Sequence, residues 1–154
     1  MSALLTYRNL CLLSAAGSLG MLLAALAFQF IGDLTPCPMC IWQRWPHVVA
    51  VLAGGIALAT PLGAWLGALA MVVNAGLSLY HTGVERAWWE GPNTCTSAPI
   101  GGLTPDELFN QIMEAPLVRC DEVAWEFLGL SMASWNGLVC LGLAATWMLA
   151  LQRR

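Results

Sequence analysis

The sequence predicts an all-α membrane protein: a four-transmembrane-helix bundle with a long outer loop that contains a short amphipathic helix. Composition is the first indication, because 58% of the residues are hydrophobic, 10% are charged and mean hydropathy is +0.69. Soluble domains usually carry about 25% charged residues. The second indication is a set of three uncharged apolar stretches, at residues 10–32, 45–80 and 127–152.

The first apolar stretch predicts a helix over residues 10–32. One membrane crossing needs about 20 helical residues, and this stretch is long enough. A cleaved signal peptide is the alternative, because Ala25-Leu26-Ala27 resembles a cleavage site. The apolar run exceeds the usual signal-peptide core of about 7–15 residues, however, so we expect a retained helix.

The second stretch predicts two helices. A single helix over residues 45–80 would be about 54 Å long at 1.5 Å per residue, which is too long for one crossing. The segment Thr60-Pro61-Leu62-Gly63 is a natural break. We therefore expect one membrane domain over residues 1–154. Its helices span about 10–32, 40–59, 63–81 and 134–151, and its outer loops span about 33–39 and 82–133.

The distribution of charge predicts the orientation. With four spans both termini share one side, which holds Arg8, Arg153, Arg154 and no acidic residue. The segments 33–44 and 82–126 hold all nine acidic residues. Because basic residues near helix ends mark the cytoplasmic side, we expect cytoplasmic termini and two external loops. The net charge of −3 argues against nucleic acid as a partner.

Tryptophan is concentrated near the predicted helix ends. An aromatic belt at the lipid headgroups accounts for this pattern better than the high frequency of tryptophan alone. The outer ends carry Trp42, Trp45, Trp88, Trp89 and Trp135, and the inner ends carry Trp65 and Trp147.

The outer loop contains a predicted helix that begins at Thr104. Thr104 suits the cap, Pro105 suits the first helical position, and Glu107 completes a capping box. Its apolar side chains are Leu108, Phe109, Ile112 and Met113. This amphipathic helix lies either on the membrane surface or against the bundle ends.

Six cysteines fall into two groups. Cys11 and Cys140 lie in predicted helices, where buried cysteines usually act as small hydrophobic residues. The other four are Cys37 and Cys40, in a C-x-x-C motif, and Cys95 and Cys120, in the long loop. All four lie on the side expected to be external, where an even number of cysteines indicates disulfides.

Three kinds of site fit these four cysteines to different degrees. A zinc site is disfavoured because structural zinc usually uses two closely spaced pairs, and Cys95 and Cys120 lie far apart. A c-type haem is excluded because Ile41, not histidine, follows Cys40. Disulfides remain. A structural bridge between Cys95 and Cys120 is a serious alternative to a redox role, whereas C-x-x-C pairs more often do redox chemistry.

The residues after the C-x-x-C motif favour a reactive thiolate at Cys40. Pro38 is well placed to begin a helix, so Cys40 is expected in the first turn, where free N–H groups favour negative charge. Arg44 lies four residues later on the same face and favours the thiolate further. An arginine that reaches toward the headgroups is the alternative for Arg44.

The chain resembles the DsbB family of bacterial inner-membrane disulfide oxidoreductases. The shared features are four helices, a C-x-x-C-x-x-x-R motif opening the second helix, and a cysteine pair in a long outer loop. The segments Tyr80–Glu85 and Trp125–Met132 also resemble that family, so the resemblance covers nearly the whole chain.

The resemblance implies a relay of electrons. A reduced, periplasmic DsbA-like protein with a thioredoxin fold attacks a Cys95–Cys120 disulfide, at Cys95. Cys120 then attacks Cys37, and Cys40 passes the electrons to a membrane quinone, either ubiquinone or menaquinone. The residues implied at the quinone site are Cys40, Arg44 and His81; for His81 the alternative is a histidine at the membrane interface with satisfied hydrogen bonds. His47 is a weaker candidate of the same kind, and Gln43 departs from relatives that have an acidic residue there.

Two rival hypotheses belong to other classes. Vitamin K epoxide reductase-like proteins also resemble four-helix bundles with paired cysteines, but there the C-x-x-C motif comes late in the chain and here it comes first. The other rival is a non-enzymatic membrane scaffold whose loops are joined by two structural disulfides. A partner dedicated to one substrate, rather than to general secretion, is a variant of the DsbB-like hypothesis.

Overall fold

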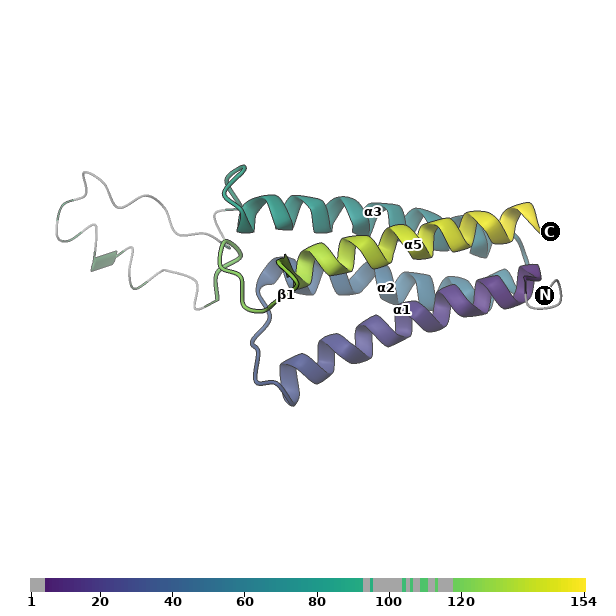
Figure 1. Cartoon of the computed structure of the whole chain (residues 1–154), viewed down its shortest axis with the longest axis horizontal. Helices are drawn as coiled ribbons and strands as arrows, with labels where there is room; N and C mark the ends of the chain where they lie inside the picture. Colours follow the sequence, from purple (N-terminus) through teal and green to yellow (C-terminus); the bar gives the residue numbers. More distant parts are fainter. Residues whose placement is uncertain are drawn as a thin grey trace.

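The computed structural model consists of four long helices that run alongside one another as a bundle (Figure 1). It describes residues 5–92, 95, 104, 106, 109, 110, 113 and 118–154. The helices are α1 (Tyr7–Phe30), α2 (Pro38–Ala57), α3 (Leu62–Glu85) and α5 (Met132–Gln152). The two termini lie at the same end of the bundle (Figure 1). The prediction of an all-helical bundle is therefore confirmed.

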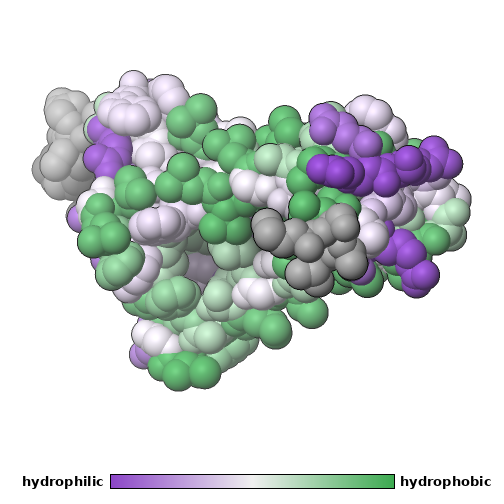
Figure 2. Space-filling view, turned by 45° about the vertical axis from the view of Figure 1, so that its right-hand side comes forward, coloured by the Kyte–Doolittle hydropathy of each residue, from purple (hydrophilic) through white to green (hydrophobic). Residues whose placement is uncertain are grey.

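Three of the four helices, α1, α3 and α5, are long and apolar enough to cross a membrane. On the face seen in Figure 2, apolar residues cover the middle, and hydrophilic residues gather toward the two ends. The chain is therefore a helical membrane protein. The remaining helix, α2, has 20 residues but carries Gln43, Arg44 and His47 in its first half, which lowers its hydropathy.

Three of the four long helices begin directly after a residue whose side chain accepts a hydrogen bond from the first turn. Thr6 caps α1 and accepts a hydrogen bond from the backbone N–H of Asn9. Ser131 caps α5 in the same way, accepting from the N–H of Ser134. Cys37 is the cap of α2, and Pro38 occupies the first turn, where its missing N–H costs nothing.

The helix ends differ from the predicted ends by a few residues. The long apolar stretch is divided as predicted, since α2 ends at Ala57 and α3 begins at Leu62. The largest difference is at α3, which continues to Glu85 instead of ending near residue 81. The added turn is buried, so packing against the outer segments extends the helix beyond its apolar run.

A short hairpin that the sequence analysis did not predict precedes α5. Strand β1 (Glu126–Phe127) pairs antiparallel with β2 (Leu130–Ser131). Both turn residues have positive φ, 53° at Leu128 and 76° at Gly129. Glycine adopts that backbone freely, but leucine does not, and an apolar Leu-Gly turn lacks the usual Asn-Gly or Asp-Gly signal.

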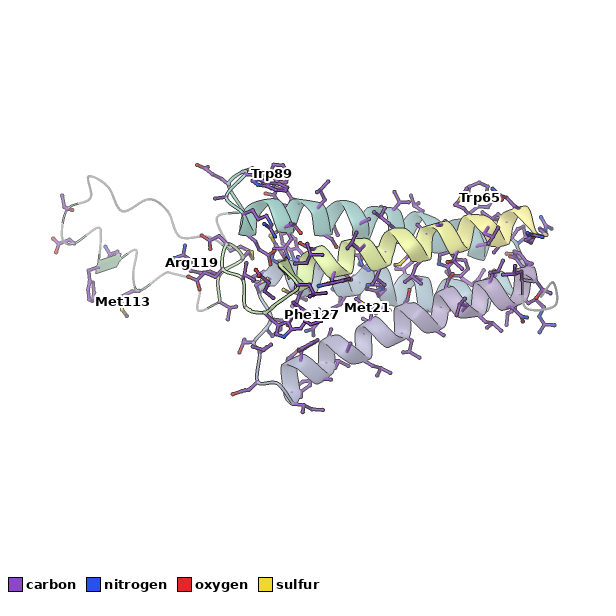
Figure 3. The ribbon with its side chains drawn as sticks, in the orientation of Figure 1. Met21, Trp65, Trp89, Met113, Arg119 and Phe127 are labelled. Atoms are coloured by element: carbon purple, nitrogen blue, oxygen red, sulfur yellow. A yellow bond between two sulfur atoms is a disulfide. The ribbon has the colours of Figure 1, made fainter. Side chains whose placement is uncertain are left out.

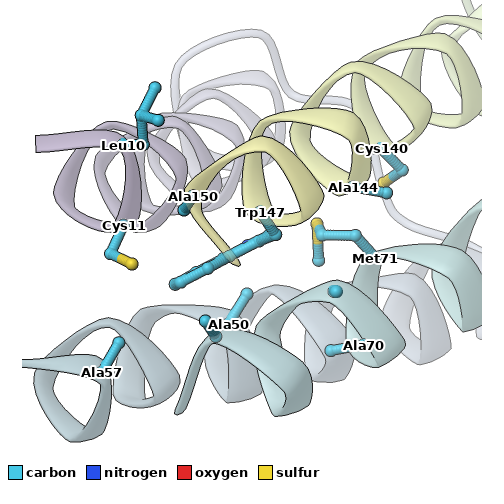
Figure 4. Packing of buried hydrophobic residues seen from close by; sticks show 12 residues of the cluster. Leu10, Cys11, Ala50, Ala57, Ala70, Met71, Cys140, Ala144, Trp147 and Ala150 are labelled. Carbon is cyan, nitrogen blue, oxygen red and sulfur yellow. The ribbon is translucent and has the colours of Figure 1, made fainter. Parts of the chain in front are cut away.

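The core at the end of the bundle near the termini is built around Trp147. This side chain is fully buried and packs among small residues such as Ala50 and Ala150 (Figure 4). The prediction that Trp147 joins an interfacial belt is therefore wrong, because glycine at position 67 leaves room for the indole ring between α3 and α5. Trp65, by contrast, is 56% exposed, and Cys11 and Cys140 are free and buried as predicted.

The contact between α2 and α3 depends on Gly63. A Cβ atom at this position would overlap the backbone of Ala57 and Ala53. We expect Gly63→Ala to destabilise the protein by about 1–3 kcal/mol and to lower the apparent unfolding temperature by several degrees in detergent. Gly76→Ala in the same helix is the matched control, because nothing lies within 4 Å of its Cβ position. Equal unfolding temperatures for the two variants would contradict this packing.

The short helix expected from Thr104 onward falls mostly outside the described residues, so it stays a prediction.

Candidate functional site

A cavity of about 450 Å³ lies at the end of the bundle opposite the termini, between α1, α2 and α5. Toward its C-terminal end α1 diverges from the other helices (Figure 1), and its apolar side chains form one wall. The other walls bring together residues far apart in the sequence. They include the predicted site residues Cys37, Cys40, Arg44 and His81.

The two cysteines of the C-x-x-C motif are free thiols at this cavity. Their Sγ atoms lie 2.9 Å apart in a hydrogen bond. Cys37 also accepts a hydrogen bond from the backbone N–H of Cys40, at 3.2 Å. Because Cys37 caps the helix, its sulfur receives the N–H that the first turn leaves free.

This geometry corrects the predicted position of the thiolate. The hydrogen bond with the Cys40 thiol lowers the pKa of Cys37, and the His81 ring lowers it further, against the opposing effect of burial. In the two-thiol form, the helix N-terminus thus favours negative charge on Cys37 rather than on Cys40. The reason is the cap: the free N–H of the first turn points back to residue 37, not to residue 40.

The second cysteine pair forms a disulfide that packs on the first. Cys95 is bonded to Cys120, and the backbone N–H of Cys120 donates to the carbonyl of Cys95 at 2.9 Å. The Sγ atoms of Cys37 and Cys120 and a ring nitrogen of His81 lie within 4.8 Å of one another. Both bridged cysteines are fully buried. A thiol of the motif therefore lies beside a disulfide with which it can exchange.

Those three side chains form a cluster that a metal ion would also favour. Cys120 is engaged in the disulfide, however, so its sulfur is not available as a thiolate ligand. Metal binding by cysteine requires the thiolate. The donor set in this structure thus fits thiol exchange better than zinc.

His81 is held in place by its neighbours on both ring nitrogens. Its Nδ1 lies 2.8 Å from the side-chain nitrogen of Gln43, and its Nε2 lies 3.6 Å from Cys37 Sγ. Nε2 is also 3.8 Å from a carboxylate oxygen of Glu85, whose side chain is only 6% exposed. Ser131 donates a hydrogen bond to the other carboxylate oxygen. His81 therefore lies between the reactive sulfur and a buried acid.

Arg44 contributes a cation to the same cavity. Its Nη1 donates to Oε1 of Gln29 on α1 at 2.8 Å, which ties α2 to the diverging end of α1. Among the described residues no carboxylate forms an ion pair with Arg44. A guanidinium has five N–H donors, and those that do not bond Gln29 are suited to hold an electron-rich oxygen in the cavity.

Aromatic rings line the part of the cavity next to the hairpin. The rings of Phe28 and Trp125 have centroids 5.3 Å apart, those of Trp125 and Phe127 are 6.0 Å apart, and those of Phe127 and Trp135 are 6.3 Å apart. Phe127 from β1 and Met21 from α1 lie in the region between α1 and α5 (Figure 3). The cavity wall is thus mainly apolar, with a small group of polar side chains.

Several residues at this site were not predicted from the sequence. Glu85 has a usable signal, since it follows His81 by four residues on the same helix face. Gln43 and Asn136 have none, because a single amide in an apolar helix does not show which partner it faces. The hairpin that carries Phe127 lacked the usual turn residues.

Comparisons with known proteins agree with this geometry. The family model for disulfide bond formation protein DsbB matches residues 7–150. A disulfide bond formation protein B of Hahella chejuensis is 31% identical, with 100% of this chain and 99% of that protein covered. One from Dechloromonas aromatica is 30% identical, over 90% and 88%. One from Shewanella sp. (strain MR-4) is 36% identical, over 73% and 68%.

No solved structure matches the chain. The family match covers nearly all of the bundle, including both cysteine pairs, and the relatives are similar over most of their own length. The chain therefore belongs to the DsbB family of disulfide bond formation proteins.

Proposed function

We propose that this protein oxidises a reduced, periplasmic DsbA-like protein with a thioredoxin fold and transfers the electrons to a membrane quinone, ubiquinone or menaquinone. One observation carries the proposal. The Cys95–Cys120 disulfide packs directly on the C-x-x-C pair, and that pair lines a mainly apolar cavity. Thiol exchange and a lipid-soluble oxidant therefore share one site.

The thiol steps are ordinary exchange reactions. The partner's thiolate attacks Cys95, a mixed disulfide forms, and Cys120 leaves as a thiolate. Both sulfur atoms are buried, so the partner's approach requires a local movement at this end of the bundle. Cys120 then attacks Cys37 of the oxidised motif, the Cys37–Cys40 bond breaks, and Cys40 leaves as a thiolate at the cavity.

The partner's second thiol and Cys95 complete the exchange. The partner's second thiol resolves its bond to Cys95, and Cys95 resolves the bond between Cys120 and Cys37. The result is an oxidised partner, a restored Cys95–Cys120 disulfide and two free thiols at Cys37 and Cys40.

The cavity suits a quinone headgroup. Its volume of about 450 Å³ lies within the usual range for small-molecule sites, about 300–1,000 Å³. Apolar side chains of α1 supply a wall for a flat, apolar ring, and Arg44 supplies N–H donors for an oxygen. A bound quinone supplies an acceptor for two electrons and two protons. His81 and Glu85 are positioned to hold a proton next to the sulfur that loses one.

The same proposal includes the placement in the bacterial inner membrane. α2 lies among three apolar helices and is long enough to be the fourth span. Arg8, Arg153 and Arg154 support cytoplasmic termini, and the cysteine loops are then periplasmic. Residues 1–154 then form a single membrane domain that contacts lipid, partner protein and quinone.

The rival functions fit the site less well. A scaffold with two structural disulfides would not need free thiols at Cys37 and Cys40 beside an apolar cavity. The family match also disfavours the vitamin K epoxide reductase-like hypothesis.

The test is a coupled assay with purified protein, a reduced DsbA-like partner and decylubiquinone. Arg44→Ala is expected to lower kcat/KM for the quinone about 10–100-fold, because a charged hydrogen bond contributes about 1.5–3 kcal/mol. The Cys95–Cys120 bridge should remain intact on a non-reducing gel. Arg8→Ala is the matched control at the opposite end of the bundle and should keep wild-type kinetics. An Arg44→Ala variant with unchanged kinetics would make Arg44 a headgroup anchor.

A further inference from the structure

A chain of hydrogen bonds, buried or partly buried, links Cys37 to His47, a histidine to which the relay gives no role. Four contacts make up this chain. Cys37 Sγ lies 3.6 Å from His81 Nε2, and His81 Nδ1 lies 2.8 Å from Gln43 Nε2. Asn136 Nδ2 donates to Gln43 Oε1 at 2.8 Å, and Asn136 Oδ1 lies 2.9 Å from His47 Nε2. The chain crosses the bundle from the outer end to the interior.

The outer end of this series of hydrogen bonds determines which atom donates in each of them. The sulfur of Cys37 and a carboxyl oxygen of Glu85 are both acceptors, and both face Nε2 of His81. Nε2 must therefore bear the hydrogen, and in a neutral ring Nδ1 then accepts from the amide nitrogen of Gln43. This leaves Oε1 of Gln43 as an acceptor, which receives hydrogen bonds from Asn136 and from Ser78.

The same logic determines the tautomer of His47. Asn136 uses its amide N–H groups on Gln43 and Ser78, so its oxygen faces His47. Nε2 of His47 must donate to that oxygen. In the neutral ring Nδ1 of His47 then carries no hydrogen and is an acceptor.

That acceptor has no partner among the described residues. His47 is 3% exposed, and its Nδ1 is buried without a hydrogen bond. Leaving such a group unpaired is unfavourable, so a donor from outside the chain is expected. His47 lines the same cavity as Cys40 and Arg44 and lies three residues after Arg44 on α2. Because Nδ1 itself is buried, a ligand in the cavity reaches it only after a small movement of the His47 ring or of its neighbours.

We propose that Nδ1 of His47 accepts a hydrogen bond from a hydroxyl of the quinol, so that the cavity binds the reduced ligand more tightly than the quinone. A quinone carbonyl is itself an acceptor and gains nothing from an unprotonated Nδ1, whereas a quinol hydroxyl donates to it. The inference rests on the proposed function and adds a preference for one redox form of the ligand.

This preference would favour the electron transfer. When Cys37 and Cys40 close to a disulfide, they lose two electrons and two protons, and the quinone gains the same two electrons and two protons as it becomes quinol. A site that binds quinol more tightly than quinone shifts this equilibrium toward quinol by the ratio of the two affinities.

Binding measurements without turnover test the proposal. In a Cys40→Ala background, titrations with decylubiquinone and decylubiquinol can be followed by the fluorescence of Trp125 and Trp135, which line the cavity. His47→Leu in that background is expected to weaken quinol binding about tenfold, the effect of one buried hydrogen bond of about 1.4 kcal/mol, and to change quinone binding less than about twofold.

The other outcomes of that titration separate the two proposals. Equal weakening of both ligands, or of neither, would overturn the role of His47 while leaving the quinone site in place. A protein with His47 intact that bound neither ligand would overturn the quinone site and this inference together.

A spectroscopic measurement on the wild-type residue avoids reliance on a folded variant. The chain has only two histidines, so ¹⁵N-histidine labelling gives two ring systems to assign. Nδ1 of His47 is expected to show the shift of an unprotonated nitrogen, to move upfield on addition of decylubiquinol, and to stay in place with decylubiquinone. A protonated Nδ1 before ligand is added, or equal shifts with both ligands, would contradict the proposal.

Discussion

Replacing Cys40 by serine is expected to lower quinone reduction on the order of 10³-fold in the coupled assay, as removal of a covalent catalytic group does. Cys40 lines the cavity and is the only cysteine that can close a C-x-x-C disulfide with Cys37. A serine hydroxyl neither forms that disulfide nor ionises near neutral pH. Cys120 would then have no Cys37–Cys40 disulfide to attack, so the electrons would stop at the Cys95 and Cys120 thiols. The measurement is the fall in decylubiquinone absorbance with reduced partner in excess.

Cys11→Ser is the matched control for this loss. Cys11 is a free, fully buried cysteine of α1 that does not line the cavity. Its replacement tests whether removing any buried thiol slows the reaction. We expect wild-type turnover from the folded Cys11→Ser protein. A Cys40→Ser protein that retained more than a tenth of wild-type turnover would contradict the relay.

Replacing Cys120 by alanine is expected to convert most of the protein into a covalent adduct with an oxidised DsbA-like partner. Without Cys120, the Cys95 thiolate attacks the partner's disulfide, a mixed disulfide forms, and one partner thiol is released. Cys120 is no longer present to resolve that bond from this protein's side. The adduct appears on a non-reducing gel as a band at the summed mass that disappears with dithiothreitol.

The control for trapping is Cys95→Ala, which leaves Cys120 as the free thiol of that pair. The Sγ atom of Cys120 lies within 4.8 Å of Cys37 Sγ and of a ring nitrogen of His81. We expect much less adduct from this variant. The scaffold hypothesis predicts no adduct from either variant, and equal adduct from both would show that the partner does not discriminate between the two sulfur atoms.

The sequence was sufficient for the features that depend on composition and spacing. In lipid, the backbone N–H and C=O groups of an apolar stretch must bond within the stretch itself, as they do in a helix. The bundle could therefore be predicted from residues 10–32, 45–80 and 127–152. The C-x-x-C spacing identified a redox pair because no structural role needs so small a loop. The break before Leu62 followed from the proline at position 61.

Features that depend on three-dimensional partners were not predictable. Trp147 has the position of a belt residue, but the space opened by Gly67 on another helix buries it. The thiolate was assigned to Cys40 because that residue lies in the first turn, whereas the cap geometry favours Cys37. Both assignments place the start of the helix at Pro38; they differ in which sulfur receives the free N–H of the first turn, and only the cap geometry determines that.

The hydrogen-bond partners of the buried polar residues could not be predicted from the sequence either. The sequence does not show which partner Gln43 has, yet it is buried and joins His81 to Asn136 across three helices. Buried amides need partners, and the partner is set by helix packing rather than by local sequence. The hydrogen bonds that lead to His47 therefore depend on how α2, α3 and α5 pack against one another.

The central claim is that electrons pass between the two cysteine pairs through Cys120 and Cys37. The most direct test is the disulfide that forms in a Cys40→Ser, Cys95→Ser double variant, in which only these two cysteines of the relay remain. Peptide mapping after alkylation is expected to find Cys37 bonded to Cys120 in most molecules, because their sulfur atoms lie within 4.8 Å. The matched Cys37→Ser, Cys95→Ser variant should show little Cys40–Cys120 bond. Free thiols in the first variant, or a more abundant bond in the second, would contradict the claim.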